Sequence, residues 1–331
     1  MRLLVTGAAG FIGSNFVHRT LETRPDVSVT VLDSLTYAGR ISNLDGALNK
    51  IEFVNGDIRN AALVDALVAK ADQVVHFAAE SHNDNSLFDP KAFIETNVLG
   101  TYELLQACVR HNVRLHHVST DEVFGDLEFA SESKFNRATP YNPSSPYSAS
   151  KASSDHLVRA WVRSFGLLAT ISNCSNNYGL RQHEEKLIPR TILLAASGIK
   201  PKIYGLGANV RDWIHVDDHC DGIWSVIDRG QLGETYLLGS NCERTNLQVV
   251  KSVLGVLGLD QNFIEYVPDR PGHDKRYAID ASATYSELGW VPRKPVLEES
   301  LPQLVEYYLG QLHAGKIDIS SLSNAGLSTR L

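Results

Sequence analysis

Short apolar runs alternate with longer amphipathic segments through the first half of the chain. The runs show no alternation of apolar and polar positions, which is typical of strands buried on both faces of a sheet. We predict strands at 2–7, 29–33, 51–57, 73–79, 114–120 and 168–173. Helices are predicted between them at 11–24, 60–71, 92–111 and 147–165. This order predicts an α/β fold with a doubly wound, parallel, Rossmann-type sheet.

The pattern changes near residue 180, where prolines separate shorter elements. Helices are predicted here at 187–197, 217–229, 246–257 and 297–312. We therefore predict a main domain over 1–179, with a return segment near 211–240, and a smaller mixed α/β domain over 180–315. The Ser-rich end, 316–331, has little apolar material and is predicted to be a flexible tail.

Composition and charge exclude several classes of function. The chain has 331 residues and a net charge of −7, which argues against a protein that binds nucleic acid or an anionic membrane surface. No run approaches 18 apolar residues, and "MRLLVTGAAG" is typical of a first strand rather than a signal peptide. The cysteines form no C-x-x-C pair, so we predict buried, reduced thiols and no metal site: Cys108, Cys174, Cys220 and Cys242. A cytoplasmic protein is expected.

Three glycines follow the first strand directly. Gly7, Gly10 and Gly13 lie in "VTGAAGFIGSN" with the spacing G-x-x-G-x-x-G, one residue longer than the usual dinucleotide fingerprint. Without side chains at these positions, backbone amides and a helix N-terminus can approach a pyrophosphate. The turn therefore predicts a dinucleotide cofactor.

Acidic and small residues at the following strand ends suit the rest of that cofactor. Asp33 lies twenty residues after Gly13, where a carboxylate would accept hydrogen bonds from ribose hydroxyls and repel a 2′-phosphate. Arg40 nearby leaves room for NADP, but Asp33 favours NAD. Asp57 and Ile58 would flank the adenine, and "FAAESH" at 77–82 offers small residues along the middle of the dinucleotide.

Tyr147 and Lys151, in "YSASK", are four residues apart and would share one face of a helix. A free phenol has a pKa of about 10 and is a poor base at neutral pH. A neighbouring ammonium and an oxidised nicotinamide would favour the phenolate. Such pairs are common on helices, but together with the glycine turn, Asp33 and Ser119-Thr120 this one predicts a catalytic base.

Two adjacent acids, Asp121 and Glu122, follow the predicted strand 114–120. They could be solvated loop residues, or they could be reacting groups at the edge of a pocket. Neighbouring side chains of an extended strand point in opposite directions, so both acids can share a site only on a turn. If they react, one must be protonated, and its pKa must be raised by burial and by the charge of its neighbour.

These motifs resemble the extended short-chain dehydrogenase/reductase superfamily, through "TGAAGFIG", Asp33, "NVLGT" from 97, Ser119-Thr120 and "YSASK". Within it, the chain is most similar to the dTDP-glucose 4,6-dehydratase family. The stretches that carry this similarity include "FAAESHNDNS", "STDEVFGDL", "NCSNNYG", "EKLIPR", "GANVRDWIHVDDH" and "DRPGHDKRYAID". His183-Glu184 departs from an aromatic-proline pattern of the family, which we interpret as loop variation.

The resemblance implies a reaction in three steps on one hexose. Tyr147 takes the proton of the C4 hydroxyl while a hydride passes from C4 to NAD, with Thr120 and Ser119 near the C4 oxygen. Glu122 then removes the C5 proton and Asp121 protonates the departing C6 hydroxyl. The hydride finally returns to C6, so NAD is expected to stay tightly bound throughout.

The resemblance also implies a set of binding residues. Residues 1–179 would bind NAD through Gly7, Gly10, Phe11, Ile12, Gly13, Asp33, Asp57, Ile58, Ala78, Ala79, Ser81, Thr96, Ser119, Tyr147, Lys151 and Asn177. Residues 180–315 would bind the sugar nucleotide. Basic residues for its phosphates would be Lys186, Arg211, Arg270 and His273, and further contacts would come from His82, Thr120, Asn176, Leu187, Lys202, Tyr204, Asn246 and Tyr277.

Two other readings of the sequence remain open. A nucleotide-sugar 4-epimerase also oxidises C4 but has no need of Asp121 and Glu122. A cofactor-binding regulator would keep the fold without the reacting groups. A homodimer, paired through the helices at 92–111 and 147–165, is implied by the resemblance alone.

Overall fold

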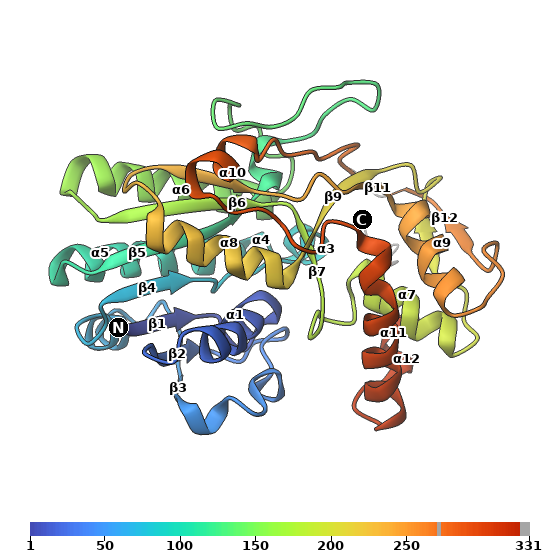
Figure 1. Cartoon of the computed structure of the whole chain (residues 1–331), viewed down its shortest axis with the longest axis horizontal. Helices are drawn as coiled ribbons and strands as arrows, with labels where there is room; N and C mark the ends of the chain where they lie inside the picture. Colours follow the sequence, from blue (N-terminus) through green and yellow to red (C-terminus); the bar gives the residue numbers. More distant parts are fainter. Residues whose placement is uncertain (270–272, 325–331) are drawn as a thin grey trace.

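The computed structural model describes residues 1–269 and 273–324. Among these residues, a seven-stranded parallel sheet has the strand order β10-β6-β5-β4-β1-β2-β3 (Figure 1). Its strands are β1 Arg2–Thr6, β2 Ser28–Asp33, β3 Ile51–Asn55, β4 Gln73–His76, β5 Arg114–Thr120, β6 Ala169–Cys174 and β10 Thr235–Leu238. The predicted doubly wound Rossmann-type sheet is confirmed, and the order reverses between β1 and β4, where such sheets bind ligands.

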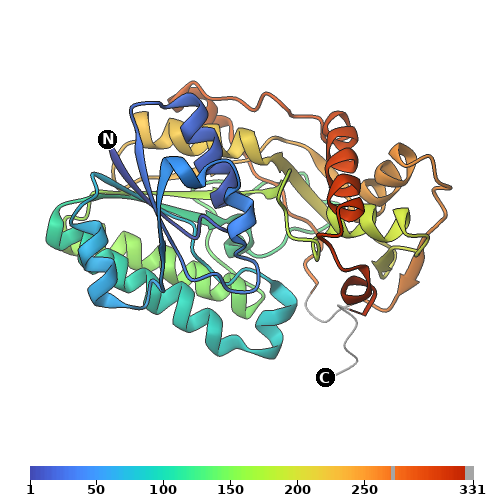
Figure 2. The same cartoon turned by 90° about the horizontal axis from the view of Figure 1, so that it is seen from below.

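Helices cover both faces of this sheet. One face carries α1 (Phe11–Thr23) and α8 (Val216–Arg229), and the other carries α2 (Ala61–Val68), α5 (Thr101–His111) and α6 (Pro146–Phe165) (Figure 2). Each layer buries its apolar stripe against the β-branched and leucine side chains of the strands. This packing leaves the C-terminal strand ends at one edge of the sheet.

The start of α6 fixes the position of Tyr147. Ser145 and Ser148 form a reciprocal capping box, in which the Ser145 side chain accepts from the Ser148 amide, and Pro146 occupies the first turn. The helix predicted as 92–111 is instead built from α4 (Pro90–Phe93), a π-helical segment η3 (Ile94–Gly100) and α5, with α3 (Asn83–Phe88) before them.

A second structural region, with its own apolar core and small sheets, begins after residue 175. The helices α7 (Leu187–Ala196), α9 (Asn246–Val256) and α11 (Leu297–His313) share one apolar core. Small sheets join β11 (Glu243–Thr245), β9 (Val210–His215) and β7 (Asn176–Tyr178), and separately β12 (Glu265–Val267) and β8 (Lys202–Tyr204). Within the predicted return segment 211–240, β10 comes back to the main sheet and pairs with β6.

Short elements complete the described chain, and one of them lies in the predicted tail. They are η1 (Ile41–Leu44), η2 (Leu48–Lys50), η4 (Asp121–Phe124), α10 (Ser282–Leu288) and α12 (Ile319–Asn324). In α12, Leu322 is buried and its carbonyl accepts a hydrogen bond of 3.0 Å from Arg190 of α7. The part of 316–331 that the structure describes is therefore partly helical and docked on α7.

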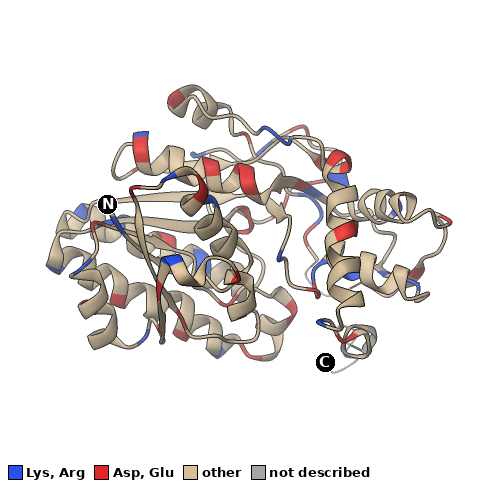
Figure 3. Cartoon of the chain, turned by 60° about the horizontal axis from the view of Figure 1, so that its bottom comes forward, with Lys and Arg blue, Asp and Glu red and all other residues tan. Residues whose placement is uncertain are grey.

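The charges of the described residues are mixed rather than segregated. Figure 3 shows acidic and basic residues interspersed along both parts of the chain. Among the helices in the described ranges, none combines the length and apolar character needed to cross a bilayer.

Candidate active site

A cavity of about 400 Å³ lies at the C-terminal ends of the strands of the main sheet and extends to the loop before α7. It brings together residues that were predicted separately. Those lining it are Gly7, Gly10, Phe11, Ile12, Gly13, Asp33, Asp57, Ile58, Ala78, Ala79, Ser81, Thr96, Ser119, Thr120, Asp121, Glu122, Tyr147, Lys151, Asn176, Asn177 and Lys186. Every predicted cofactor and catalytic residue is in this group.

Each of the three glycines is favoured at its position for a different structural reason. Gly7 has φ +73°, and a Cβ there would lie 2.5 Å from the backbone nitrogen of Ala78, so only glycine lets β1 end against the segment after β4. A Cβ on Gly13 would lie 2.5 Å from the Gly7 carbonyl oxygen, so α1 can start close to the turn. Gly10 faces the cavity, and the amides of the first turn of α1 lack helical partners. This cradle fits the pyrophosphate of a dinucleotide.

Asp33 is held in place by the same turn. Its Oδ2 accepts the Ala9 amide and its Oδ1 the Leu35 amide, both at 2.8 Å. Burial raises the pKa of this carboxyl, and the two amides oppose that effect. The guanidinium of Arg40 is paired with Glu184 and so is not free to meet a 2′-phosphate. These residues fit NAD better than NADP.

Asp121 and Glu122 lie on a turn, which is the geometry in which both side chains can share a site. β5 ends at Thr120, whose hydroxyl accepts the Glu122 amide at 3.3 Å, and the two acids begin the 3₁₀ helix η4. Asp121 is 1% exposed, and its Oδ2 has no hydrogen-bond partner among the residues that the structure describes. Burial first, and then the charges of Glu122 and Asp212, raise the pKa of Asp121 well above its usual value. This rise favours the protonated form of Asp121, which is the form that a proton donor needs.

Glu122 has a different environment from its neighbour. It is half-buried, and its Oε2 accepts a hydrogen bond of 2.6 Å from the Asn83 side chain. Asn83 is in turn bonded by the Ser145 hydroxyl at 2.8 Å, which ties Glu122 to the start of α6. The two adjacent acids thus differ in environment. Among the described residues, Asp121 is buried and accepts a hydrogen bond only on Oδ1, from Thr120, whereas Glu122 is held by the side-chain amide of Asn83.

Tyr147 and Lys151 line the same cavity from α6, and burial acts strongly on both of them. Burial first, and then the charge of Glu122, raise the pKa of Tyr147 well above its usual value. The Lys151 ammonium donates to the Val118 carbonyl at 2.9 Å, and burial lowers the pKa of this lysine. The chain alone thus favours the neutral phenol, because burial and the charge of Glu122 outweigh the hydrogen bond with Thr120 that lowers this pKa. The positive charge of an oxidised nicotinamide would act in the opposite direction.

A buried carboxylate beneath the site was missed by the sequence analysis. Asp155 lies one helical turn beyond Lys151 and is fully buried. Its partners are Ser119, Tyr141 and Asn173 on Oδ2, at 3.0, 2.8 and 3.0 Å, and His117 at 3.2 Å from Oδ1. Burial alone would raise the pKa of Asp155, but His117, Lys151 and Tyr141 outweigh it and lower this pKa. The carboxylate holds the end of β5 in place, and its position four residues after Lys151 was the available signal.

The predicted substrate residues divide into two groups. Thr120, Asn176 and Lys186 line the cavity, whereas the other described ones are not among its lining residues: His82, Leu187, Lys202, Tyr204, Arg211, Asn246, His273 and Tyr277. Arg211 stacks over Tyr277, with its guanidinium carbon 4.2 Å from the ring centre, and the ring of Tyr204 meets that of His273 at 6.0 Å. Arg270 lies outside the described residues.

Two residues of the second group, Arg211 and Tyr277, interact electrostatically with Asp121 and Glu122. The charge of Arg211 opposes the rise in the pKa of Asp121, and Glu122 adds to the burial that raises the pKa of Tyr277. His82 is 3.5 Å from the carboxylate of Glu185, which itself lines the cavity. Gln182 and Glu185, in the loop 179–186, also line the cavity. They could not be predicted from the sequence, because this loop has no periodic pattern.

Comparison with known proteins identifies the family. The family model described as GDP-mannose 4,6 dehydratase matches residues 4–301. A dTDP-glucose 4,6-dehydratase of Mycolicibacterium smegmatis is 58% identical over 308 residues, which cover 93% of each chain. The dTDP-glucose 4,6-dehydratase of Streptomyces antibioticus is 47% identical, with 93% of this chain and 92% of the relative covered.

Solved structures give the same answer. The crystal structure of a dTDP-glucose 4,6-dehydratase from Streptomyces venezuelae with NAD bound has a TM-score of 0.91 at 45% identity, covering 95% of this chain and 98% of that one. A UDP-glucose 4-epimerase of Thermotoga maritima shares the fold, with a TM-score of 0.87, at 27% identity over 94% of this chain and 100% of that chain. The family model and the relatives differ in the nucleotide sugar they name, and full-length identity decides between them. The chain belongs to the dTDP-glucose 4,6-dehydratase family.

Proposed function

We propose that the chain converts dTDP-glucose to dTDP-4-keto-6-deoxyglucose and water, using NAD that stays bound through the cycle. One observation carries the proposal beyond the family fold. Asp121, which is buried and has a raised pKa, and its neighbour Glu122 lie in the same cavity as the glycine turn and Tyr147. A 4-epimerase, the alternative reading, needs no acid and base for C5 and C6.

The first step needs a base at the C4 hydroxyl. Tyr147, as the phenolate that the positive charge of NAD would favour, would accept this proton at its phenolic oxygen. Lys151 lies four residues further along α6, and Thr120 lies beside Tyr147 at the end of β5. NAD, when bound, supplies the hydride acceptor at C4 and later the hydride donor at C6. The first turn of α1 and Asp33 would orient it from one side of the cavity.

The elimination needs a base and an acid at neighbouring carbons. Once C4 is a ketone, its C5 proton is acidic, and the carboxylate of Glu122 would take it. The carboxyl of Asp121 would give its proton to the C6 hydroxyl, which leaves as water. Glu122 exchanges this proton with solvent and then protonates C5. The proton gained by Tyr147 balances the one that Asp121 lost. Burial serves this step because it raises the pKa of Asp121 and so favours the protonated carboxyl.

The diphosphate and base of the substrate would be bound from the second half of the chain. Lys186, Arg211, Arg270 and His273 would contact the phosphates, since guanidinium and ammonium groups suit phosphate oxygens. The other proposed contacts are His82, Asn176, Leu187, Lys202, Tyr204, Asn246 and Tyr277. Asn177, whose Oδ1 is 2.9 Å from His219, would lie near the nicotinamide.

The direct test is incubation of the protein with dTDP-glucose and analysis of the product by mass spectrometry. We expect loss of one water and a keto sugar that develops ultraviolet absorbance in strong base. A product of unchanged mass would instead indicate an epimerase. UDP-glucose should turn over much more slowly, and equal rates would contradict the thymidine preference.

Retention of the cofactor has its own test. The purified protein should release NAD on denaturation without any having been added, because the cofactor is regenerated within each turnover. Protein that is isolated without NAD, and that turns over only when NAD is supplied stoichiometrically, would contradict this.

We also propose a homodimer paired through the helical layer of α5 and α6. Large apolar side chains are exposed there: Leu99 is 52%, Tyr102 36% and Phe165 58% exposed. Tyr102 and Phe165 each meet the Trp161 ring, at 5.9 and 5.1 Å, which joins the two helices in one apolar surface. Sedimentation should give a dimer, and Leu99→Glu with Phe165→Glu should give a monomer.

A cytoplasmic location is proposed on the state of the thiols. All four cysteines are buried and unpaired, which suits a reducing compartment. Fractionation of cells that express the full chain would test this.

A further inference from the structure

We propose that Glu184, through its ion pair with Arg40, closes the cofactor cavity and sets how firmly NAD is retained. The inference rests on the proposed function only in that NAD is the molecule retained. It concerns two residues to which the sequence analysis gave no role, since Glu184 was interpreted as loop variation and Arg40 as a residue that left room for NADP.

The pair connects segments that are 144 positions apart. Arg40 immediately precedes η1, in the loop after β2, and Glu184 lies in the loop between β7 and α7. The two terminal guanidinium nitrogens of Arg40 donate to the carboxylate of Glu184. Nη1 donates to Oε1, and Nη2 donates to Oε2 at 2.7 Å. Such a two-bond geometry is the strongest form of an arginine–carboxylate contact.

Burial makes this contact more than an ordinary surface pair. The Glu184 side chain is 10% exposed, and that of Arg40 is 42% exposed. Burial alone would raise the pKa of Glu184, but the bonds from Arg40 outweigh it and hold this pKa below its usual value. The carboxylate therefore stays ionised, and it depends on Arg40 for its charge partner.

Both loops contribute to the lining of the cofactor cavity, although Arg40 and Glu184 are not lining residues themselves. Ser34, Thr36, Ala38 and Gly39 line it from the first loop, and Gln182, His183, Glu185 and Lys186 line it from the second. The Tyr37 ring meets the edge of the His183 ring at 5.7 Å, next to the ion pair. The pair thus joins the loops at the rim of the space that the dinucleotide would fill.

Each loop is also tied to the frame of the cofactor site. The Arg40 amide donates to the Ala9 carbonyl at 3.0 Å, and Ala9 itself binds Asp33. On the other side, the Gln182 side chain donates to the Asn177 carbonyl at 2.9 Å. With both loops anchored in this way, breaking the pair would free their tips without unfolding the site, and a bound dinucleotide would leave faster.

Arg244 and Glu298 provide a matched control. They form the same two-bond arrangement, at 2.7 and 3.0 Å, with side chains 31% and 37% exposed, and they join β11 to α11 away from the cavity lining. If the Arg40–Glu184 pair served stability alone, Glu184→Gln and Glu298→Gln could each lower thermal stability, but neither would change NAD release.

The experiment measures NAD release from the purified holoprotein. Bound NAD is followed over time after removal of free NAD, with a coupled enzymatic assay of the released fraction. We expect Glu184→Gln to speed release about 5- to 10-fold, the range for a partly buried charged pair, and Glu298→Gln to change it less than 2-fold. Arg40→Ala should match Glu184→Gln, and the double variant should release NAD no faster than either single one.

Two outcomes would overturn the proposal. One is release from Glu184→Gln at the rate of the unaltered protein, and the other is equal acceleration by Glu298→Gln. Should Glu184→Gln fold poorly, Arg40→Lys is the second variant, because lysine keeps the positive charge but lacks the paired donors of the guanidinium group. We then expect a release rate between those of the unaltered protein and Arg40→Ala. A release rate equal to that of the unaltered protein would contradict the proposal. An unaltered protein that holds no NAD at all would instead be a failure of the proposed function.

Discussion

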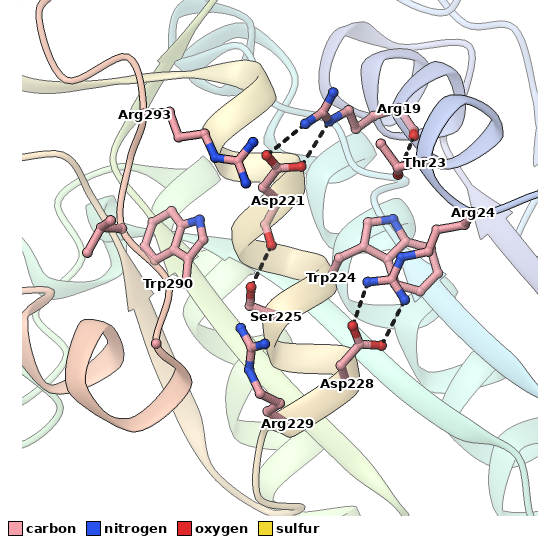
Figure 4. A pocket seen from close by; sticks show the side chains of 12 residues that line it. Arg19, Thr23, Arg24, Asp221, Trp224, Ser225, Asp228, Arg229, Trp290 and Arg293 are labelled. Atoms are coloured by element: carbon pink, nitrogen blue, oxygen red, sulfur yellow. Dashed lines mark hydrogen bonds and ion pairs between the residues drawn. The ribbon is translucent and has the colours of Figure 1, made fainter.

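Two cavities of similar size show how a reactive site differs from a structural one. The cavity at the strand ends has a volume of about 400 Å³, and a second one, of about 480 Å³, lies between α1, α8 and the segment 289–293 (Figure 4). In the second, paired bonds join Arg19 to Asp221 at 2.9 and 3.0 Å, and Arg24 to Asp228 at 3.2 and 2.5 Å. Its aspartates are matched by guanidinium groups.

The strand-end cavity is arranged in the opposite way. Asp121 is buried without a cationic partner in contact, and its Oδ2 finds no hydrogen bond among the described residues. An unpaired buried carboxyl is costly, and folds keep one chiefly where its protonation state is used. A choice by volume would favour the cavity between α1 and α8, whose aspartates are paired with arginines. The unpaired buried carboxyl instead indicates that the strand-end cavity is the active site.

The largest effect is expected from Tyr147→Phe. Without the phenolic oxygen nothing accepts the C4 proton, so the first step and every later one should slow by about 10³-fold or more. Rapid mixing with dTDP-glucose should then show no reduced cofactor. NAD content should be unchanged, and a variant that still reduces its cofactor at the normal rate would break the assignment.

Asp121→Asn should have the next largest effect. The amide cannot protonate the C6 hydroxyl, so formation of the keto-deoxy sugar should fall about 10²- to 10³-fold while C4 oxidation survives. In the unaltered protein, kcat should fall as the pH rises through the raised pKa of Asp121. Asp221→Asn, in the second cavity, is the control and should leave kcat unchanged.

Asp212 allows a test of stability against pH. Burial raises its pKa to about 6, above the value of about 4 in an unfolded chain. Its protonated form stabilises the fold below about pH 4, and this contribution of about 3 kcal/mol is lost as the pH rises to about 6.

Asp212→Asn cannot ionise, and its Oδ1 can still accept the Cys242 amide, which is bonded at 2.7 Å. The variant should therefore gain stability relative to the unaltered protein between pH 4 and pH 7, as measured by denaturant unfolding at each pH. A stability difference independent of pH would contradict this reading. Because Asp212 also raises the pKa of Asp121, the alkaline fall in kcat should move to lower pH.

The smallest effect is expected from Arg24→Ala in the second cavity. It removes a half-exposed ion pair with Asp228 and a guanidinium 4.4 Å from the Trp224 ring centre. The free energy of unfolding should fall by about 1 kcal/mol, with no change in kcat. A large loss of activity would mean that the two cavities are coupled.

Local patterns made most of the site predictable. The glycine turn, Asp33 and the acids after β5 could be placed because strand ends of a parallel sheet meet at one edge. Glu185 and Gln182 could not, since their loop reaches the cavity only through tertiary contacts. The Arg40–Glu184 pair spans 144 positions, and no local pattern joins such residues. The burial that raises the pKa of Tyr147 could not be predicted from the sequence, because it depends on the packed fold.

The central claim is that Asp121 and Glu122 divide the elimination between an acid and a base. The most direct measurement is the reaction of dTDP-glucose in deuterated water with the unaltered protein and with Glu122→Gln. We predict one deuterium at C5 of the normal product, and for Glu122→Gln reduced cofactor without water loss. A Glu122→Gln protein that formed the product at the normal rate, with deuterium at C5, would contradict the account.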